Sequence, residues 1–439
     1  MVNETVREIL AFVEENDIKF IRLAFCDSFG MQKNISIMPD ELERAFQHGI
    51  SFDASAIRGF MGVERSDLFL QPDPGTLSIL PWRPMQGRVA RFFCNIRYPD
   101  GRPFEGDGRY ILKNAVQRCA DMGNTCRIGA ECEFYLFQLN EDGEPVLVPH
   151  DKGGYFDISP LDKGENVRRE ICLTLEEMGL RPESSHHEQG PGQNEIDFHY
   201  SDACTAADDL ITFKSVVKAI SLRNGLFASF LPKPFADQSG SGLHINISLS
   251  RDGENLFQDL KEEGSVAASF IAGVLDRAAE ITAFLNPLTN SYARFGAFEA
   301  PRFIAWSRMN RAQLVRIPAT SSSEHSRMEV RSPDPACNPY LAYTLLLEAG
   351  MEGIAQGKRL GPAMDFDPYA PGARVEGLPK LPATLEEALA LAGGSEFVRR
   401  VLPQTVVDKY LEFKSAQAHR VAQAEDRAAM ERELYFLSI

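Results

Sequence analysis

Hydrophobic and polar positions along the first hundred residues follow two periods, one helical and one of two residues. In RVARFFCNIRY (88–98) the apolar even positions alternate with Arg91, Asn95 and Arg97, which predicts a half-buried strand. The other predicted elements are a helix at about 3–15, strands at 18–25 and Asn34–Ile37, a polar turn at Cys26–Met31 and a helix from Pro39. These elements predict a small α+β unit, closed by the turn-rich segment YPDGRPFEGDGR.

Beyond Gly108, helical patterns alternate with single strands, which predicts a second and larger α+β domain. The predicted helices are Tyr110–Met122, Asn166–Met178, Ala206–Arg223 and Ser265–Leu285. Leu360–Pro382 is rich in Pro, Gly and Asp, so we expect a long loop there, followed by closing helices that include AEDRAAMEREL.

Four of the predicted strands direct polar side chains to one face and apolar side chains to the other. In CRIGAECEFYLF, Glu131 and Glu133 oppose an apolar face made by Cys126, Ile128, Ala130, Cys132, Phe134 and Leu136. The polar residues of the other three strands are Glu195, Asp197 and His199, then His244, Asn246 and Ser248, and then Arg327, Glu329 and Arg331. The turn QGPGQ can return the chain so that Glu188 lies near Glu195.

A one-sided sheet commonly turns such a face to water, so each strand alone has an ordinary structural explanation. The joint pattern favours a shared polar funnel, because it collects five glutamates, a histidine and several arginines on otherwise apolar strands. Crowded carboxylates repel one another unless cations lie among them, and oxygen-rich sets suit Mg²⁺ or Mn²⁺ better than zinc. Two such ions beside basic residues are typical of phosphoryl transfer.

The acidic balance of the chain disfavours nucleic-acid and membrane surfaces, since 62 Asp and Glu outnumber 46 Lys and Arg for a net charge of −16. We expect no signal peptide and no membrane span. The eight cysteines form no CxxC pair and lie mostly in apolar segments, which predicts buried thiols and a reducing cytoplasm. The usual glycine-rich nucleotide signatures are missing, so any ATP site must be of another type.

Eight segments carry a resemblance to a known family. GAECEFYLF, HHEQGPGQNEIDF, KPFADQSGSGLHINISL, NPLTNSYARF, EAPRFIAWSRMNRAQLVRIP and RMEVRSPDPACNPYLA closely resemble, in order, the motifs of bacterial type I glutamine synthetases. IKFIRLAFCDSFG and SFDASAIRGF resemble the N-terminal motifs of that family. The resemblance implies a β-grasp domain at 1–103 and a catalytic domain at 104–439, whose antiparallel strands form a funnel flanked by helices. It also implies a dodecamer of two hexameric rings, with active sites between neighbouring subunits.

The resemblance further implies the site residues. Glu133, Glu188 and Glu195 resemble the ligands of a metal near glutamate and ammonium, and Glu131, His244 and Glu329 those of a metal that bridges the ATP phosphates. The implied substrate-binding residues are Arg294, Arg331, Gly240 and Tyr155, and the implied ATP-binding residues are Asn246, Ser248, Arg311 and Arg316. Arg311 is also expected to be catalytic, together with Asp53 from the adjacent subunit, which would deprotonate ammonium, and Glu299, which would close the site.

The implied reaction joins ammonia to glutamate through a γ-glutamyl phosphate made from ATP. Asp53 and Glu299 also have simpler explanations, as a turn cap and a loop acid. Departures from the family pattern are Ala54, Ala56, Ser239, Ala293 and Phe298. The flap, YARFGAFEAP, is also one residue shorter than the common form of the family. A γ-glutamyl ligase acting on a larger amine, such as a polyamine or ethanolamine, and a non-catalytic nitrogen-status binding protein remain alternatives.

Overall fold

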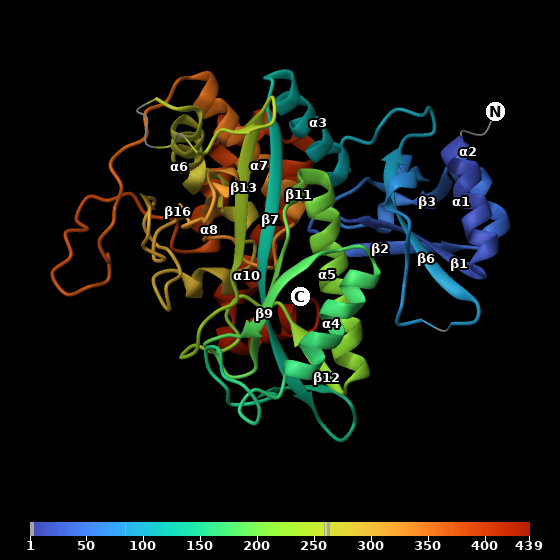
Figure 1. Ribbon diagram of the computed structural model, residues 1–439, viewed down its shortest axis with the longest axis horizontal. Helices are drawn as coiled ribbons and strands as arrows, with labels where there is room; N and C mark the ends of the chain where they lie inside the picture. Colours follow the sequence, from blue (N-terminus) through green and yellow to red (C-terminus); the bar gives the residue numbers. More distant parts are fainter. Residues whose placement is uncertain (1–3, 84, 259, 261–263) are drawn as a thin grey trace.

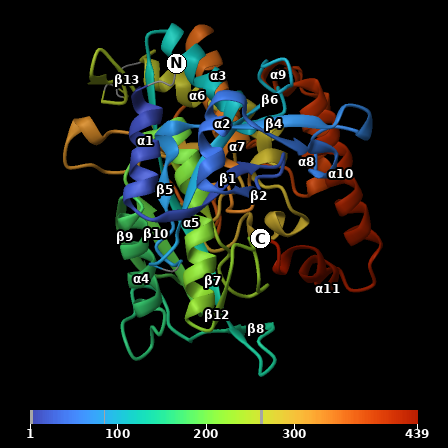
Figure 2. The ribbon, with the colours of Figure 1, turned by 90° about the vertical axis from the view of Figure 1, so that its right-hand side faces the viewer.

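The computed structural model describes residues 4–83, 85–258, 260 and 264–439. The chain forms two parts that lie side by side, a smaller N-terminal part on the right in Figure 1 and a larger part on the left. Figure 2 views the molecule from the side of the smaller part, whose sheet lies in front of helices of the larger part. Within the described residues, no helix is both long enough and apolar enough to cross a membrane.

The smaller part is a six-stranded sheet with two helices packed against its core. Its elements are α1 (Glu4–Glu15), β1 (Ile18–Cys26), β2 (Gln32–Ile37), α2 (Leu42–His48), β3 (Ile50–Asp53), β4 (Asp67–Pro72), β5 (Ser78–Ile79) and β6 (Arg88–Arg97). The strand order is β2-β1-β6-β4-β3, with β5 on β6, and β1 runs parallel to β6.

Most predicted elements of this part are confirmed, although residue 3 of the predicted first helix lies outside the described residues. The predicted strand at Asn34–Ile37 begins two residues earlier, at Gln32. The sequence does not predict β3, β4 and β5, which have four, six and two residues.

The prediction of a half-buried strand at 88–98 is wrong, because β6 is buried on both faces over most of its length. Its even-numbered apolar residues pack in the core of the smaller part as predicted. On the other face, Phe93 belongs to the core of the larger part. Arg91 is only 6% exposed and donates from Nη1 to Thr212 Oγ1 at 2.7 Å. The larger part therefore covers the face that alternation alone assigned to solvent.

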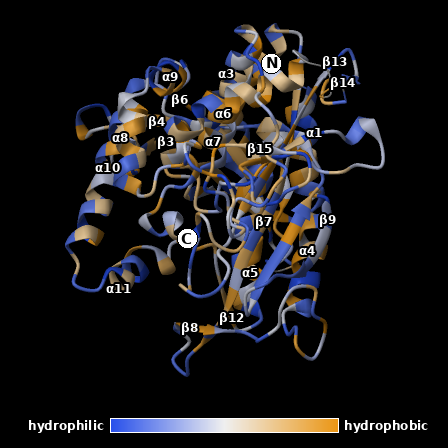
Figure 3. Ribbon diagram, turned by 90° about the vertical axis from the view of Figure 1, so that its left-hand side faces the viewer, coloured by the Kyte–Doolittle hydropathy of each residue, from blue (hydrophilic) through white to orange (hydrophobic). Residues whose placement is uncertain are grey.

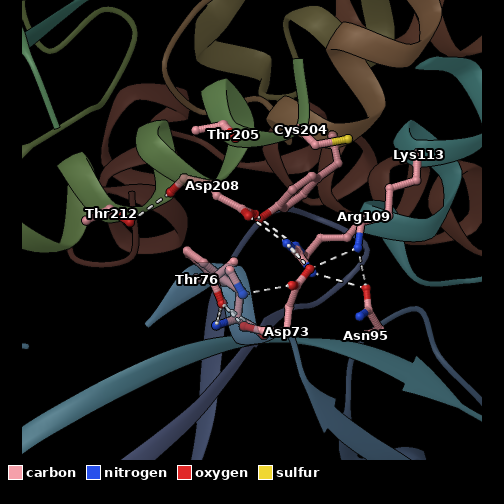
Figure 4. A network of polar contacts seen from close by, with 12 residues as sticks. Asp73, Thr76, Asn95, Arg109, Lys113, Cys204, Thr205, Asp208 and Thr212 are labelled. Atoms are coloured by element: carbon pink, nitrogen blue, oxygen red, sulfur yellow. Dashed lines mark hydrogen bonds and ion pairs between the residues drawn. The ribbon is translucent and has the colours of Figure 1, made fainter. Parts of the chain in front are cut away.

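Arg109 joins the two parts where they meet (Figure 4). Its guanidinium donates to Asp208 Oδ1 from Nε at 2.9 Å, and to Asp208 Oδ2 and Asp73 Oδ2 from Nη2 at 2.7 and 3.1 Å. Lys113 Nζ also donates to Asp73 Oδ2 and to Asn95 Oδ1, at 3.1 and 2.7 Å. Charged hydrogen bonds of this kind contribute about 1.5–3 kcal/mol each, so the network holds the two parts in one orientation.

The larger part is built on an eleven-stranded sheet in the order β15-β16-β17-β13-β7-β10-β9, with four short strands at its sides. The strands are β7 (Thr125–Leu139), β8 (Pro145–Pro149), β9 (Pro182–His187), β10 (Gln193–Phe198), β11 (Ser201–Asp202), β12 (Leu226–Ser229), β13 (Leu243–Arg251), β14 (Glu254–Asn255), β15 (Trp306–Ser307), β16 (Val315–Arg316) and β17 (Met328–Val330). The described pairings of this sheet are antiparallel except for β15 with β16. The α+β class is confirmed.

The helices of the larger part are α3 (Gly108–Asp121), α4 (Glu165–Glu177), α5 (Ala203–Arg223), α6 (Val266–Leu285), α7 (Pro339–Ala355), α8 (Leu385–Gly394), α9 (Glu396–Val401), α10 (Gln404–Gln423) and α11 (Arg427–Glu431). The four predicted helices correspond to α3, α4, α5 and α6, each with ends within three residues of the prediction. Leu360–Pro382 contains no named helix or strand, as predicted, although Lys380 bridges to Phe303.

The predicted apolar face of β7 lies in the main core, where α3, α5 and α7 pack together. Because helices cover that face, the functional side chains can gather only on the opposite one. Figure 3 views the molecule from the side opposite to Figure 2 and shows β9, coloured as hydrophilic, at this open side of the sheet.

Candidate functional site

The strand register agrees with the predicted shared polar face. Glu195 on β10 lies opposite Glu133 on β7, and His244 on β13 lies opposite Glu131 on β7. On the next strand, Glu329 lies opposite Asn246 of β13. Directly paired residues of neighbouring strands point to the same side of a sheet, so β7, β10, β13 and β17 contribute to one polar surface.

Glu131, His244 and Glu329 form the first cluster, with ligand atoms within 4.8 Å of one another. His244 Nδ1 lies 3.1 Å from Glu131 Oε2 and 3.6 Å from Glu329 Oε1. Glu131 Oε1 also accepts from Asn246 Nδ2 at 2.9 Å. All three predicted ligands of the phosphate-bridging metal therefore lie around one point.

Glu133, Glu188 and Glu195 lie on the other side of His244 and are linked through two histidines. Glu133 and Glu195 form a group with His244, and Glu188 and Glu195 form a group with His186. His186 Nδ1 is 3.7 Å from Glu188 Oε1, and its Nε2 is 3.4 Å from Glu195 Oε2. The QGPGQ turn does bring Glu188 near Glu195, as predicted.

Crowding and burial perturb these acids strongly. Burial and the neighbouring Glu133 carboxylate raise the pKa of Glu195 well above its ordinary value. Burial also raises the pKa of Glu133, although His244 opposes the shift. For Glu131 the burial effect is outweighed by the hydrogen bonds of His244 and Asn246, which lower its pKa to about 2. Uncompensated carboxylates in a buried cluster are the donor set of hard divalent cations, so these residues fit Mg²⁺ or Mn²⁺.

A cavity of about 890 Å³ opens over the two clusters. It is lined by five arginines, namely Arg294, Arg311, Arg316, Arg327 and Arg331. Arg316 and Arg331 donate to Glu329, and Arg294 Nη1 donates to the carbonyl oxygen of Ser332 at 3.0 Å. The Nε atoms of Arg294, Arg316 and Arg331 are buried without a hydrogen-bond partner. Five guanidinium groups around one cavity favour an anionic ligand there, because guanidinium groups form charge-assisted hydrogen bonds with carboxylates and phosphates.

Gly240 lies beside Arg294 at the cavity wall, where no side chain fits. A Cβ at this position would come within 2.4 Å of the Pro232 carbonyl oxygen and 2.6 Å of Arg294 Cγ. The Gly240 carbonyl oxygen accepts from Gln193 Nε2, which also donates to Glu133 Oε2 at 2.8 Å. Ser239 likewise lines the cavity and donates to Gln193 Oε1.

The flap residues 297–300 and Tyr155 form part of the rim. Glu299 is exposed and has a φ of +67°, next to Phe298 with a φ of +48°. Positive φ is rare for such residues, and its occurrence at a cavity rim fits a segment shaped for function. Tyr155 is half exposed and stacks on Phe156 with ring centroids 4.0 Å apart.

Four predicted site residues do not line this cavity. Glu329 accepts from two residues that do, Arg316 and Arg331. Asn246 donates to Glu131 and accepts from Arg327 Nε at 2.9 Å, so it supports residues that do. Ser248 lies two residues further along β13. Asp53 lies in the smaller part, where its Oδ1 accepts from Ser55 N at 2.9 Å as the cap of a short turn. The single chain therefore leaves Asp53 outside its own site.

The sequence interpretation assigned no function to several cavity residues, among them His186, Ser184, Asp197, Phe156 and Arg327. Asp197 lies opposite Glu131, and burial and that carboxylate raise its pKa to about 7. The alternation of β10 placed Asp197 on the polar face, so the signal was present. His186 had no such signal, because only the pairing of β9 with β10 brings it to Glu195.

Comparisons with known proteins agree with this geometry. Residues 17–99 match the family model "Glutamine synthetase, beta-Grasp domain", and residues 105–435 match "Glutamine synthetase, catalytic domain". A glutamine synthetase of Clostridium saccharobutylicum is 44% identical over 95% of this chain and 96% of its own length. One of Methanosarcina mazei is 45% identical over 93% of this chain and 92% of its own. The chain belongs to the glutamine synthetase family and is an enzyme of this glutamate–ammonia ligase class.

Solved structures show the same fold. A structure described as "GmaS/ADP complex-Conformation 1" has a TM-score of 0.86 and 31% identity to this chain, and covers 97% of this chain and 98% of its own. "Apo GmaS without ligand" has the same values.

Proposed function

We propose that this enzyme joins ammonia to the γ-carboxylate of L-glutamate, with ATP consumed and a γ-glutamyl phosphate as the intermediate. The products are glutamine, ADP and phosphate. The observation that carries the proposal is that five of the six predicted metal ligands and five arginines line one cavity of about 890 Å³, while the sixth ligand, Glu329, accepts hydrogen bonds from two of those arginines. Phosphoryl transfer needs this combination of positioned cations and negative ligands.

In the proposed reaction, a γ-carboxylate oxygen of glutamate attacks the terminal phosphorus of ATP, and ADP leaves. Ammonia then attacks the activated carbon, and phosphate leaves with the oxygen it received. Two Mg²⁺ or Mn²⁺ ions, held by Glu131, His244 and Glu329 and by Glu133, Glu188 and Glu195, would neutralise the phosphate and carboxylate charges.

Arginines supply the remaining positive charge. Arg294 and Arg331 are the proposed glutamate-binding residues, and their place in the cavity lining beside Glu133 and His244 supports an anion there. Arg311 and Arg316 are proposed to hold the phosphates, with Asn246 and Ser248 nearby on β13. Glu299 on the flap is proposed to exclude water from the closed site.

The proposal requires a second chain. Asp53 of a neighbouring subunit is proposed to bind and deprotonate ammonium, since Asp53 is exposed and does not line the cavity of its own chain. We propose that the enzyme is of type I and assembles as a dodecamer of two hexameric rings. We also propose that it works in the cytoplasm.

A larger amine is the second candidate, and two observations favour it. The matching solved structures are described as GmaS, a gamma-glutamylmethylamide synthetase. Ala56 also lacks the hydroxyl expected near the amine. Ammonium remains the first candidate because the curated relatives at 43–45% identity are glutamine synthetases. A non-catalytic binding protein is disfavoured, since it would have no need of a cluster of repelling acids.

Phosphate release from ATP and glutamate, measured with ammonium, methylamine, ethanolamine and putrescine, tests the proposal. We expect the highest kcat/KM with ammonium. An organic amine that exceeds ammonium would move the assignment to the second candidate, and release with none would favour the binding protein. In Ala56→Ser, a restored hydrogen bond of about 0.5–1.5 kcal/mol should lower the KM for ammonium roughly threefold to tenfold.

A further inference from the structure

The segment that carries Tyr155 and Phe156 has no helix or strand of its own. It runs from Asp151 to Lys163, between β8 and α4. Tyr155 and Phe156 both line the cavity, and Phe156 packs edge-on against His186 with ring centroids 4.7 Å apart. The position of this loop therefore decides where one wall of the proposed amine site lies.

One buried carboxylate fastens both ends of the loop. Asp151 is 5% exposed, and its Oδ1 accepts from Gly153 N at 3.2 Å, which fixes the beginning of the loop. Its Oδ2 accepts from Lys163 N at 3.0 Å, which fixes the end. Without Asp151, the two backbone donors would lose a buried acceptor.

The same carboxylate ties the loop to the strands that carry the metal-site acids. Asp151 Oδ1 accepts from Gly192 N at 2.8 Å, in the turn between β9 and β10, and lies 2.9 Å from His187 Nε2. His187 Nδ1 is 2.7 Å from the Glu188 carbonyl oxygen, which can only accept, so Nδ1 carries a proton. A continuous chain of contacts thus runs from the loop ends through His187 to the backbone of Glu188.

Arg168 on α4 provides a second tie. Its Nη1 donates to Asn194 Oδ1 at 2.6 Å and to Asp162 Oδ1 at 3.2 Å, and Asp162 Oδ1 also accepts from Gly164 N at 2.8 Å. Asn194 precedes Glu195 on β10. This tie therefore joins the end of the loop to β10 of the hairpin.

The loop conformation depends on these ties because part of it is intrinsically unfavourable. Phe156 has a φ of +61°, a region that costs a bulky residue about 1–3 kcal/mol. The Phe156 N–H donates to the His187 carbonyl oxygen at 3.1 Å, which holds the residue against β9. Local preference alone would relax this conformation and move both aromatic rings away from His186.

We propose that Asp151 is a positioning residue, which together with Arg168 holds the 152–162 loop so that Tyr155 and Phe156 form the wall of the amine site. This proposal rests on the proposed function, because it assigns that wall to the amine. Phe156 packs against His186, which lies beside Glu188 and Glu195, so loss of the loop position should weaken amine use more than ATP use.

The test is Asp151→Asn, which keeps the side-chain shape but replaces one accepting oxygen by an N–H₂ group, facing either Lys163 N or both Gly153 N and Gly192 N. Asp157→Asn is the matched control, because Asp157 lies in the same loop, is partly exposed, and its Oδ2 accepts from Gly154 N at 2.8 Å. We expect amide hydrogen exchange in peptide 152–163 to accelerate at least tenfold in Asp151→Asn, while peptides of α5 stay unchanged. The KM for ammonium should rise at least tenfold and the KM for ATP less than twofold. The control should change neither.

Unchanged exchange in Asp151→Asn, or an equal rise in both KM values, would overturn the proposal. If the natural protein does not use ammonium, the proposed function is wrong. Amide hydrogen exchange, together with the KM for the amine that the protein does use, then still tests whether Asp151 positions the loop. If Asp151→Asn does not fold, Arg168→Lys takes its place, since lysine keeps the charge and loses the fork that joins Asp162 to Asn194. The same exchange and KM pattern is then expected, and its absence would refute the proposal.

Discussion

Replacing Glu329 by glutamine removes one charge from the centre of the site. Glu329 is 1% exposed, and its Oε2 accepts from Arg316 Nη1 at 2.8 Å while its Oε1 accepts from Arg331 Nη1. Its Oε1 also lies 3.6 Å from His244 Nδ1. Glutamine has the same shape but offers one acceptor in place of two, and its N–H₂ group must face a guanidinium.

The expected cost follows from these contacts. A hydrogen bond between charged groups contributes about 1.5–3 kcal/mol, and one with a neutral partner about 0.5–1.5 kcal/mol. One contact is lost, and the other falls from the charged to the neutral range, a further loss of about 1–1.5 kcal/mol. We therefore expect the free energy of unfolding to fall by about 2.5–4.5 kcal/mol. Alanine would leave two buried guanidinium groups without a partner and should cost about 3–5 kcal/mol. At roughly 2 °C per kcal/mol for a large domain, Glu329→Gln should melt about 5–9 °C lower.

Activity and stability are measured on the same preparation, by phosphate release over a Mg²⁺ titration and by thermal unfolding. We expect kcat to fall at least 100-fold and ATP binding to weaken, because the proposed phosphate-bridging metal loses a ligand. Glu131→Gln should lose activity similarly but keep more stability, since the Glu131 side chain is 26% exposed and pairs with no arginine within hydrogen-bond distance. Glu324→Gln, an exposed acid nearby, is the control.

Near-normal turnover of Glu329→Gln at saturating Mg²⁺ would show that the ligand assignment is wrong. An unchanged melting temperature would show that the two arginine contacts contribute nothing to stability. The two outcomes are independent, so each part of the reasoning can fail alone.

Three further predictions concern other parts of the molecule. Burial and the neighbouring Asp208 raise the pKa of Asp209 to about 7, so the neutral form that stabilises the fold is lost as the pH rises toward 7. In urea unfolding, the free energy of unfolding of Asp209→Asn should therefore increase by about 2–3 kcal/mol relative to that of the natural protein between pH 5 and pH 8.5. A difference that stays constant over this range would refute the prediction. Gly240→Ala should displace Arg294 and raise the KM for glutamate at least tenfold, whereas Gly394→Ala, whose Cβ would meet nothing within 4 Å, should not. Catalysis should require assembly, so activity in a 48.9 kDa monomer measured by light scattering would contradict the proposed contribution of Asp53.

The sequence determined the α+β class, the main helices and the polar face of the central strands. Long helices and β7, at 15 residues, repeat their period often enough to be read directly. Alternation also determines which side chains share a face, so it predicts that Glu131 and Glu133 point the same way without any knowledge of strand pairing. The metal and substrate assignments, by contrast, were carried by resemblance to a family.

Only the tertiary structure decided what lies beside these residues. Pairing of β9 with β10 brings His186 to Glu195, and packing of the larger part against β6 buries Arg91, which alternation assigned to the solvent side. The contacts of Asp151 with Gly192 and Lys163 join residues 41 and 12 positions away along the chain. Periodicity shows only which side chains of one helix or strand share a face. The contacts above join separate elements, so they depend on how the whole chain packs.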